Sequence, residues 1–207
     1  MESLSHPVTS VIFEKGLTYK DFVAFTDQLV SENRTTGANQ SEAYLEYTRM
    51  CLQRMNRWDK TAKVSLEMQA LVESIHEPQL WLMITEAWCG DGSQSIPYIA
   101  KLAELNRKIE LRIIMRDEYP EVMDAYLTNG ARSIPKLVAF SEDLKCELFT
   151  WGPKPKYLMD LYKEYRQDSK GKSYQEFLEE VYLWYARNKN KDLESELYPL
   201  LQASKIS

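Results

Sequence analysis

Cysteine and histidine are scarce in this chain. The three cysteines, Cys51, Cys89 and Cys146, are too few and odd in number for a disulfide framework. The two histidines, His6 and His76, are too few and too far apart for a histidine-based metal cluster. We therefore expect no metal, and surface or capping positions for both histidines. The sparse cysteines predict a reducing, cytoplasmic setting.

Long apolar runs and an excess of basic residues are also missing. The longest apolar stretches, such as Leu80–Ile84, are only long enough for a strand and too short for a membrane-spanning helix. The segment Met1–Pro7 has no basic region followed by an apolar stretch, so we expect no secretory signal. The formal net charge of -5 gives no electrostatic reason to bind nucleic acid or an anionic membrane. We expect neither among the partners.

Glycine and proline are few as well. Seven glycines and eight prolines argue against disorder and against an all-β fold full of tight turns. The hydrophobic content of 44% and the charged content of 28% are ordinary for a globular protein. A length of 207 residues suits one domain with an extension, or two small domains.

The first third of the chain has a helical pattern. Apolar residues recur at helical spacing within 19–30, 44–55 and 64–75. Ser41 is a candidate cap for the second of these helices, and the polar segment 34–39 has the composition of a loop. We expect residues 1–77 to form a helical extension that packs on the rest of the protein.

Residues 78–168 instead alternate between strands and helices. Short apolar runs predict four strands, and helical spacing predicts helices after the first, second and fourth strands; the strands are 79–85, 110–115, 136–140 and 146–150. Strand–helix–strand implies a parallel pair, and the last two strands form an antiparallel hairpin. The predicted fold class is therefore α/β, with a central mixed sheet of four or five strands flanked by helices.

The last segment, residues 169–207, has a helical pattern rich in aromatic side chains. The aromatic residues are Tyr174, Phe177, Tyr182, Trp184, Tyr185 and Tyr198. Aromatic residues at helical spacing usually pack in a core, so we expect these to join the N-terminal helices in covering the sheet.

Cys89 lies between the first predicted strand and the helix that follows it. In open α/β sheets, sites form beyond the carboxyl ends of the strands. Unpaired amide groups at a helix N-terminus stabilise a thiolate, which is the reactive form of cysteine. Asp91 acts in the opposite direction, because its negative charge lies close to the sulfur.

The residues around Cys89 resemble the thioredoxin signature Trp-Cys-Gly-x-Cys, because the chain reads Trp88-Cys89-Gly90-Asp91-Gly92. Pro97 matches the proline of the thioredoxin active-site helix, and Ser133-Ile134-Pro135-Lys136 resembles the thioredoxin segment with a cis-proline. The chain is similar to the thioredoxin-like superfamily, in particular to bacterial thioredoxin family proteins with a Cys-Gly-Asp-Gly variant. The resemblance implies a thioredoxin fold, no cofactor, and Cys89 as the catalytic residue. The substrate-binding residues that it implies are Trp88, Gly90, Asp91, Gly92, Ile134 and Pro135.

Two residues depart from the family pattern. Gly92 stands where a thioredoxin has its second cysteine, so the pair cannot resolve a mixed disulfide by itself. We expect Gly92 to leave space beside the sulfur for a bulky thiol adduct. Met83 stands where the family has a buried acid, and nearby Glu86 is expected to be solvated. Cys51, on an apolar helical stripe, and Cys146, in the predicted hairpin, are not expected to be redox partners of Cys89.

Two functions remain open at this point. In the first, Cys89 exchanges with a protein or small-molecule disulfide, and an external thiol such as glutathione resolves the mixed disulfide. In the second, the fold is a redox-inactive module that binds an extended peptide or a protein partner.

Overall fold

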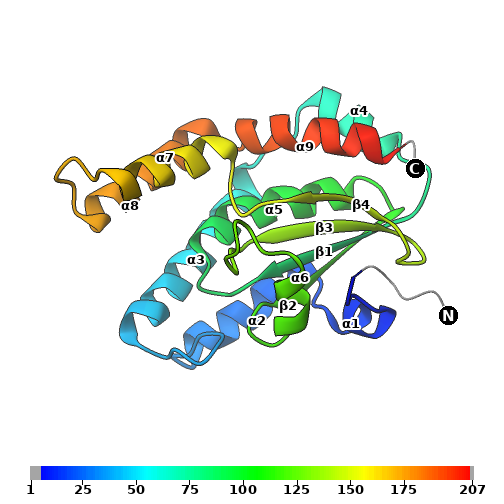
Figure 1. Ribbon diagram of the computed structural model, residues 1–207. Coiled ribbons are helices and arrows are strands. Elements are labelled where there is room, and N and C mark those ends of the chain that lie inside the picture. The colour runs from blue at the N-terminus through cyan, green and yellow to red at the C-terminus, as the bar shows by residue number, and fades with distance from the viewer. Residues whose placement is uncertain (1–5, 206–207) are drawn as a thin grey trace.

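The computed structural model describes residues 6–205 (Figure 1). In chain order the elements are α1 (Ser10–Lys15), α2 (Tyr19–Ser31), α3 (Glu42–Thr61), α4 (Leu66–Glu73), β1 (Gln79–Thr85), α5 (Gly90–Glu104), β2 (Ile109–Met115), α6 (Pro120–Ala125), β3 (Lys136–Ser141), β4 (Glu147–Trp151), α7 (Lys156–Gln167), α8 (Tyr174–Asn188) and α9 (Lys191–Ser204). The periodicity located all of these except the short helix α1, which no sequence pattern predicted.

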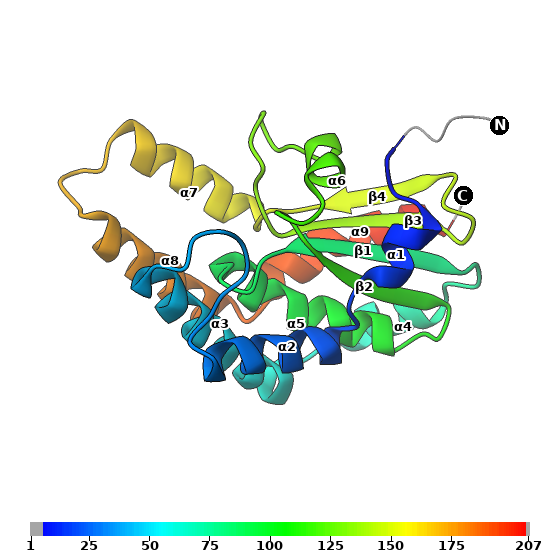
Figure 2. The ribbon, with the colours of Figure 1, turned by 90° about the horizontal axis from the view of Figure 1, so that it is seen from below.

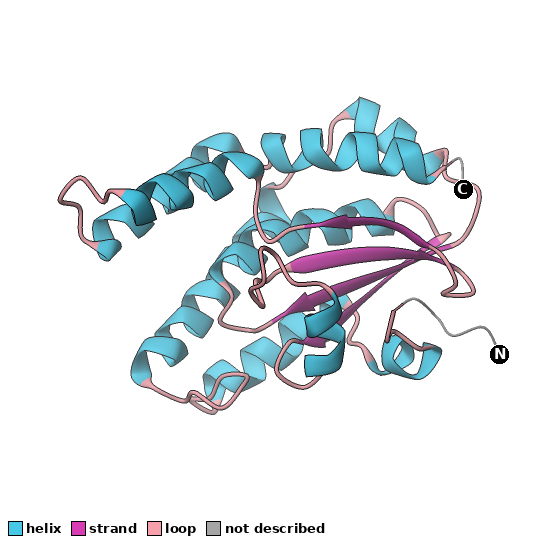
Figure 3. Cartoon of the chain, viewed as in Figure 1, coloured by secondary structure: helices cyan, strands magenta, loops and turns pink. Residues whose placement is uncertain are grey.

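The four strands form one mixed sheet in the order β2-β1-β3-β4 (Figure 3). β1 pairs in parallel with β2, through the crossover helix α5, and antiparallel with β3. The β3–β4 hairpin completes the other edge. Since β1 is central and covered on both faces, its residues are almost all buried, as expected for a continuous apolar run.

Side chains alternate between the two faces of the sheet and enter two separate cores. Trp81, Met83 and Leu137 face the larger core, to which α2, α3, α4, α5 and α9 contribute. Leu82 and Ile84 face the smaller core, which α1 and α6 cover. His6 belongs to this second side, where its Nε2 lies 2.9 Å from the Leu144 carbonyl oxygen. The expected surface position of His6 is therefore wrong.

The N-terminal extension is joined to the helix that follows Cys89. α3 packs against α5, and the Trp58 indole donates a 2.7 Å hydrogen bond to Gln94. The segment between α2 and α3 reaches the turn before Cys89, where the Thr36 hydroxyl oxygen accepts a 3.0 Å hydrogen bond from the Ala87 amide. The extension therefore supports the turn directly.

The C-terminal helices divide into two parts, which corrects the expectation that their aromatic residues cover the sheet. α7 and α8 lie side by side and extend beyond the sheet in both views (Figures 1 and 2). They form their own core around Leu158, Phe177 and Tyr185. α9 packs on the sheet instead, through three leucines at helical spacing, Leu193, Leu197 and Leu201. We call the α7–α8 pair the helical arm.

A glycine lies where the chain leaves the sheet for the helical arm. Gly152 has φ +119°, and a Cβ atom there would lie 2.3 Å from the Pro135 carbonyl oxygen. Only glycine fits such a backbone conformation and such a close approach. The chain just before the helical arm therefore lies directly against the loop before β3.

No helix among residues 6–205 is both long and apolar enough to cross a membrane.

Candidate functional site

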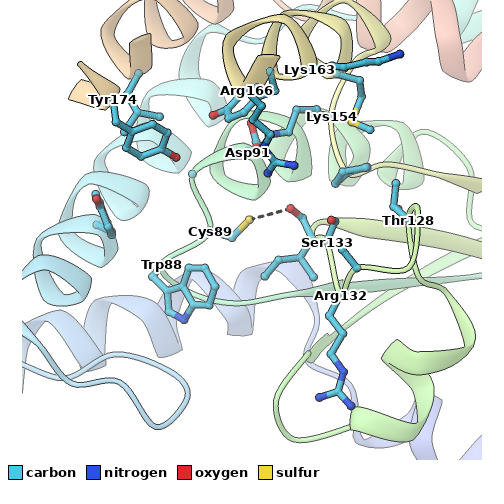
Figure 4. Close-up of a pocket in the computed structure, with 18 of the residues that line it drawn as sticks. Trp88, Cys89, Asp91, Thr128, Arg132, Ser133, Lys154, Lys163, Arg166 and Tyr174 are labelled. Carbon is cyan, nitrogen blue, oxygen red and sulfur yellow. Dashed lines mark hydrogen bonds and ion pairs between the residues drawn. The ribbon is translucent and has the colours of Figure 1, made fainter. Parts of the chain in front are cut away.

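Cys89 caps the N-terminus of α5 and is almost completely buried. Its Sγ accepts a hydrogen bond from the Gly92 amide at 3.3 Å and donates one to the Ile134 carbonyl oxygen at 3.5 Å (Figure 4). The peptide bond between Ile134 and Pro135 is cis. The strand-to-helix turn and the loop before β3 therefore meet at the sulfur, although 45 residues separate Cys89 from Ile134.

The surroundings of the sulfur favour the protonated thiol. Burial raises the pKa of Cys89 to about 12, and the negative charge of Asp91 acts in the same direction. The Gly92 amide lowers the pKa, but by less than burial raises it. The sequence left open whether the helix N-terminus or the Asp91 charge has the larger effect on the thiol; burial of the sulfur has a larger effect than either and raises the pKa.

Gly92 does not leave the space that the sequence suggested. A Cβ atom there would lie 2.7 Å from the Thr85 hydroxyl oxygen and 3.3 Å from the Cys89 Sγ. Gly92 lies in the first turn of α5, is buried, and faces Thr85 at the end of β1. The expected room for a bulky adduct at Gly92 is therefore already filled by Thr85.

Asp91 is not a free charge beside the sulfur. Its carboxylate forms a 2.7 Å ion pair with Lys154 and accepts a 2.8 Å hydrogen bond from the Tyr185 hydroxyl. Lys154 precedes α7, and Tyr185 lies on α8. Asp91 thus joins the Cys89 turn to the helical arm.

Glu86 is buried, which corrects the expectation that it is solvated. It is 1% exposed, and its Oε1 accepts a 2.9 Å hydrogen bond from the Asp117 amide. Its Oε2 has no hydrogen-bond partner in the described part of the chain. Burial raises the pKa of Glu86. A buried acid is therefore present three residues before Cys89, although Met83 occupies the position where the family has one.

The turn opens into a cavity of about 980 Å³ that the extensions build. α3 contributes Tyr44, Tyr47 and Arg54 to the lining. The helical arm contributes Arg166 and Tyr174, among others (Figure 4). Of the predicted site residues, Trp88, Cys89, Gly90, Asp91 and Ile134 line this cavity, whereas Gly92 and Pro135 do not. The wall residues of α3 and the arm were not predicted as site residues, because aromatic residues at helical spacing usually pack in a core.

The other two cysteines lie in different environments. Cys51 is 1% exposed on α3 and contributes to the same cavity wall as Cys89; burial raises the pKa of Cys51 to about 11. Cys146 is exposed in the β3–β4 turn. Within residues 6–205, no group of three or more His, Cys, Asp or Glu side chains is placed to hold a metal ion.

A mixed sheet with a cysteine at the first strand-to-helix turn, next to a cis-proline loop, defines a protein with a thioredoxin fold. The family model described as Thioredoxin matches residues 37–166, and the chain belongs to this family. No curated protein sequence matches it.

Two solved structures share the fold at low sequence identity. One is an HIV epitope scaffold, 14% identical, with a TM-score of 0.58 over 92% of this chain and 94% of the scaffold. The other is a protein of unknown function from Pseudomonas aeruginosa, 13% identical, with a TM-score of 0.60 over 94% of this chain and 98% of that one. At these identities the likeness concerns the fold.

Proposed function

We propose that this protein carries out thiol–disulfide exchange with Cys89 as its only redox-active cysteine. The position of the Cys89 Sγ carries the proposal: it caps α5, contacts the Ile134 carbonyl and lies in the wall of a cavity. A reducing, cytoplasmic and bacterial setting belongs to the same proposal. Cys51 and Cys146 take no part in the exchange.

The exchange proceeds in two steps. The Cys89 thiol loses its proton to solvent, and the thiolate attacks a disulfide RS–SR, giving a mixed disulfide and the thiolate RS⁻. RS–SR is the oxidant. A second thiol R′SH, in its thiolate form, then attacks the sulfur of the R group, which forms RS–SR′ and returns the Cys89 thiolate. Gly92 cannot perform this second step, so the resolving thiol is external.

The raised pKa of Cys89 slows both steps. Below that pKa the attacking thiolate is a small fraction of the protein, so the first step is slow at neutral pH. A thiol with a high pKa is also a poor leaving group, so the second step is slow. We expect a mixed disulfide that persists once it has formed.

The pH dependence of Cys89 alkylation tests the raised pKa, on which the expected slow exchange depends. Because the pKa is raised to about 12, the thiolate fraction grows about tenfold per pH unit through the neutral and mildly alkaline range. Iodoacetamide labelling of Cys89, followed by peptide mass spectrometry in a Cys146→Ser background, should give a log rate that rises linearly from pH 7 to 10. A plateau below pH 8 would contradict the raised pKa.

A redox-inactive binding module is the second candidate, and the burial of Cys89 favours it. Glutathione-dependent reduction of a small disulfide distinguishes the two functions. Turnover that disappears in Cys89→Ser but persists in Cys51→Ser supports exchange. Equal rates for the parent and Cys89→Ser, or loss of turnover in a folded Cys51→Ser variant, would contradict it.

A further inference from the structure

We propose that the cavity beside Cys89 selects a small anionic thiol or disulfide, whose carboxylates are held by Arg54 and Arg166. This inference names a substrate class for the proposed exchange function and rests on it. Three observations support it: the charge of the cavity, the direction of the two arginines, and the depth of the sulfur.

The cavity is cationic, although the chain as a whole is acidic. Its described lining contains six basic side chains and two carboxylates; they are Arg54, Arg116, Arg132, Lys154, Lys163 and Arg166, with Asp91 and Asp160. The formal net charge of the chain is -5. Positive charge is therefore concentrated around Cys89 against the overall balance, which attracts anions to this cavity.

Three of the six basic groups already have carboxylate partners. Lys154 pairs with Asp91 at 2.7 Å, Arg116 with Asp117 at 2.8 Å, and Arg132 with Asp124 at 2.6 Å. Arg54, Lys163 and Arg166 form no ion pair with any residue from 6 to 205. These three are the groups available to an anion.

Two of the three available groups lie beside the active-site turn. The Arg166 side chain extends from α7 into the space above Cys89, whereas Lys163 points away from it (Figure 4). Arg54 stacks on the Tyr182 ring at 3.9 Å, and its Nη1 lies 3.6 Å from where a Cβ atom of Gly90 would be. Arginine binds carboxylates with two parallel hydrogen bonds, which favours it as an anion anchor.

The depth of Cys89 favours a small molecule over a protein surface. The residue is 5% exposed, and it lines the same cavity as residues of α3 and of the helical arm. A disulfide on a broad protein surface would meet the arm before it reached the sulfur. A cavity of about 980 Å³ instead has the volume of a pocket for a small-molecule ligand. Tyr44, Tyr162 and Tyr174 add aromatic surface to its walls.

Two disulfide probes, one anionic and one neutral, test whether the cavity selects for negative charge. 5,5′-Dithiobis(2-nitrobenzoate) carries carboxylates, and 2,2′-dithiodipyridine is neutral. Each rate with Cys89, in a Cys146→Ser background, is divided by the rate with a free small thiol. The Arg54→Ala, Arg166→Ala double variant should react about tenfold more slowly with the anionic probe and within about twofold of the parent with the neutral one.

Matched variants separate charge from structure. Arg166 is exposed at the end of α7, so Arg166→Ala should fold, and Arg166→Lys should keep much of the anionic rate. Arg187→Ala removes an exposed positive charge on α8 outside the cavity and should change neither rate. Raising the salt concentration should slow the anionic probe selectively.

The outcomes distinguish a failure of the proposed anion selection from a failure of the exchange function on which it rests. If the neutral probe modifies Cys89 and the arginine variants leave the anionic rate unchanged, the selection is wrong and the exchange function stands. If neither probe modifies Cys89, the exchange function fails. Faster exchange with the protein disulfides of insulin than with oxidised glutathione would overturn the assignment to small molecules.

Discussion

At the scale of single residues, Asp91 links the chemistry of the sulfur to the position of the helical arm. Its negative charge raises the pKa of Cys89, and its two oxygens contact Lys154 and Tyr185. Replacing the carboxylate by an amide would remove the charge and release the charge of Lys154. Both changes favour the Cys89 thiolate.

Asp91→Asn should therefore lower the pKa of Cys89. For each unit by which the pKa falls, the thiolate fraction at pH 8 grows about tenfold, but nucleophilicity falls by about threefold, so alkylation should accelerate about threefold. Asp160→Asn is the control, because Asp160 is exposed in the same cavity and is not among the groups that raise this pKa. Equal acceleration in both variants would show that the effect is not specific to Asp91.

The two motif glycines differ in what they tolerate. A methyl group at Gly92 meets the Thr85 hydroxyl at 2.7 Å, whereas one at Gly90 has Arg54 at 3.6 Å as its nearest neighbour. Gly92→Ala should lower the free energy of unfolding by about 1–3 kcal/mol, and Gly90→Ala should stay within about 0.5 kcal/mol of the parent. Urea titration measures both. A Gly92→Ala variant as stable as Gly90→Ala would show that Thr85 gives way easily.

At the scale of elements, the helical arm has its own core and few ties to the sheet. The chain enters it at Gly152 and leaves it through Lys189 and Asn190, which both have positive φ. Asp91, Arg54 and Glu196 connect it to the body, the last by accepting hydrogen bonds from the Trp151 indole and the Lys156 amide. We expect such a unit to open without unfolding of the sheet.

Phe177→Ala should loosen the arm alone. The ring is 1% exposed and stacks on Tyr165 at 4.1 Å, so its loss should cost about 3–5 kcal/mol locally. Hydrogen exchange should accelerate in α7 and α8 while β1 and β3 keep their protection. Leu183→Ala, which removes a 49% exposed side chain from α8, is the control. Equal acceleration in β1 would mean that the arm and the sheet open together.

At the scale of the whole molecule, buried Glu86 couples stability to pH. Because burial raises its folded pKa, the native state binds this proton more tightly than the unfolded chain does. Stability from this group is fully present below the unfolded pKa and is lost as pH rises through the folded one. A tenfold difference in proton affinity between the two states corresponds to about 1.4 kcal/mol.

Glu86→Gln should remove this pH dependence. The amide oxygen can still accept from the Asp117 amide, but no buried charge forms at neutral pH. Thermal unfolding between pH 4 and 8 should show that the advantage of the variant over the parent grows as pH rises. Glu118→Gln, at an exposed position, should follow the parent curve. A stability advantage of the variant that grows towards low pH would contradict the raised pKa of Glu86.

Local patterns in the sequence determined the elements and the identity of the turn. The periodicity of residues 79–85, 174–188 and the other stretches is a property of neighbours along the chain, so it predicted the elements and the α/β class. The thioredoxin fold was predicted from the resemblance of the motifs around Cys89 and Pro135, and the family match confirms it. The motif around Cys89 identified the turn for the same reason.

The tertiary structure alone decided what surrounds the sulfur. Burial of Cys89 and Glu86, the contact of Thr85 with Gly92, and the wall that Arg166 helps to form all depend on segments far apart in the sequence. Hydrophobic periodicity shows that a helix has a buried face but not which element buries it. Solvation and charge at a site depend on those partners, so they follow only from the packed chain.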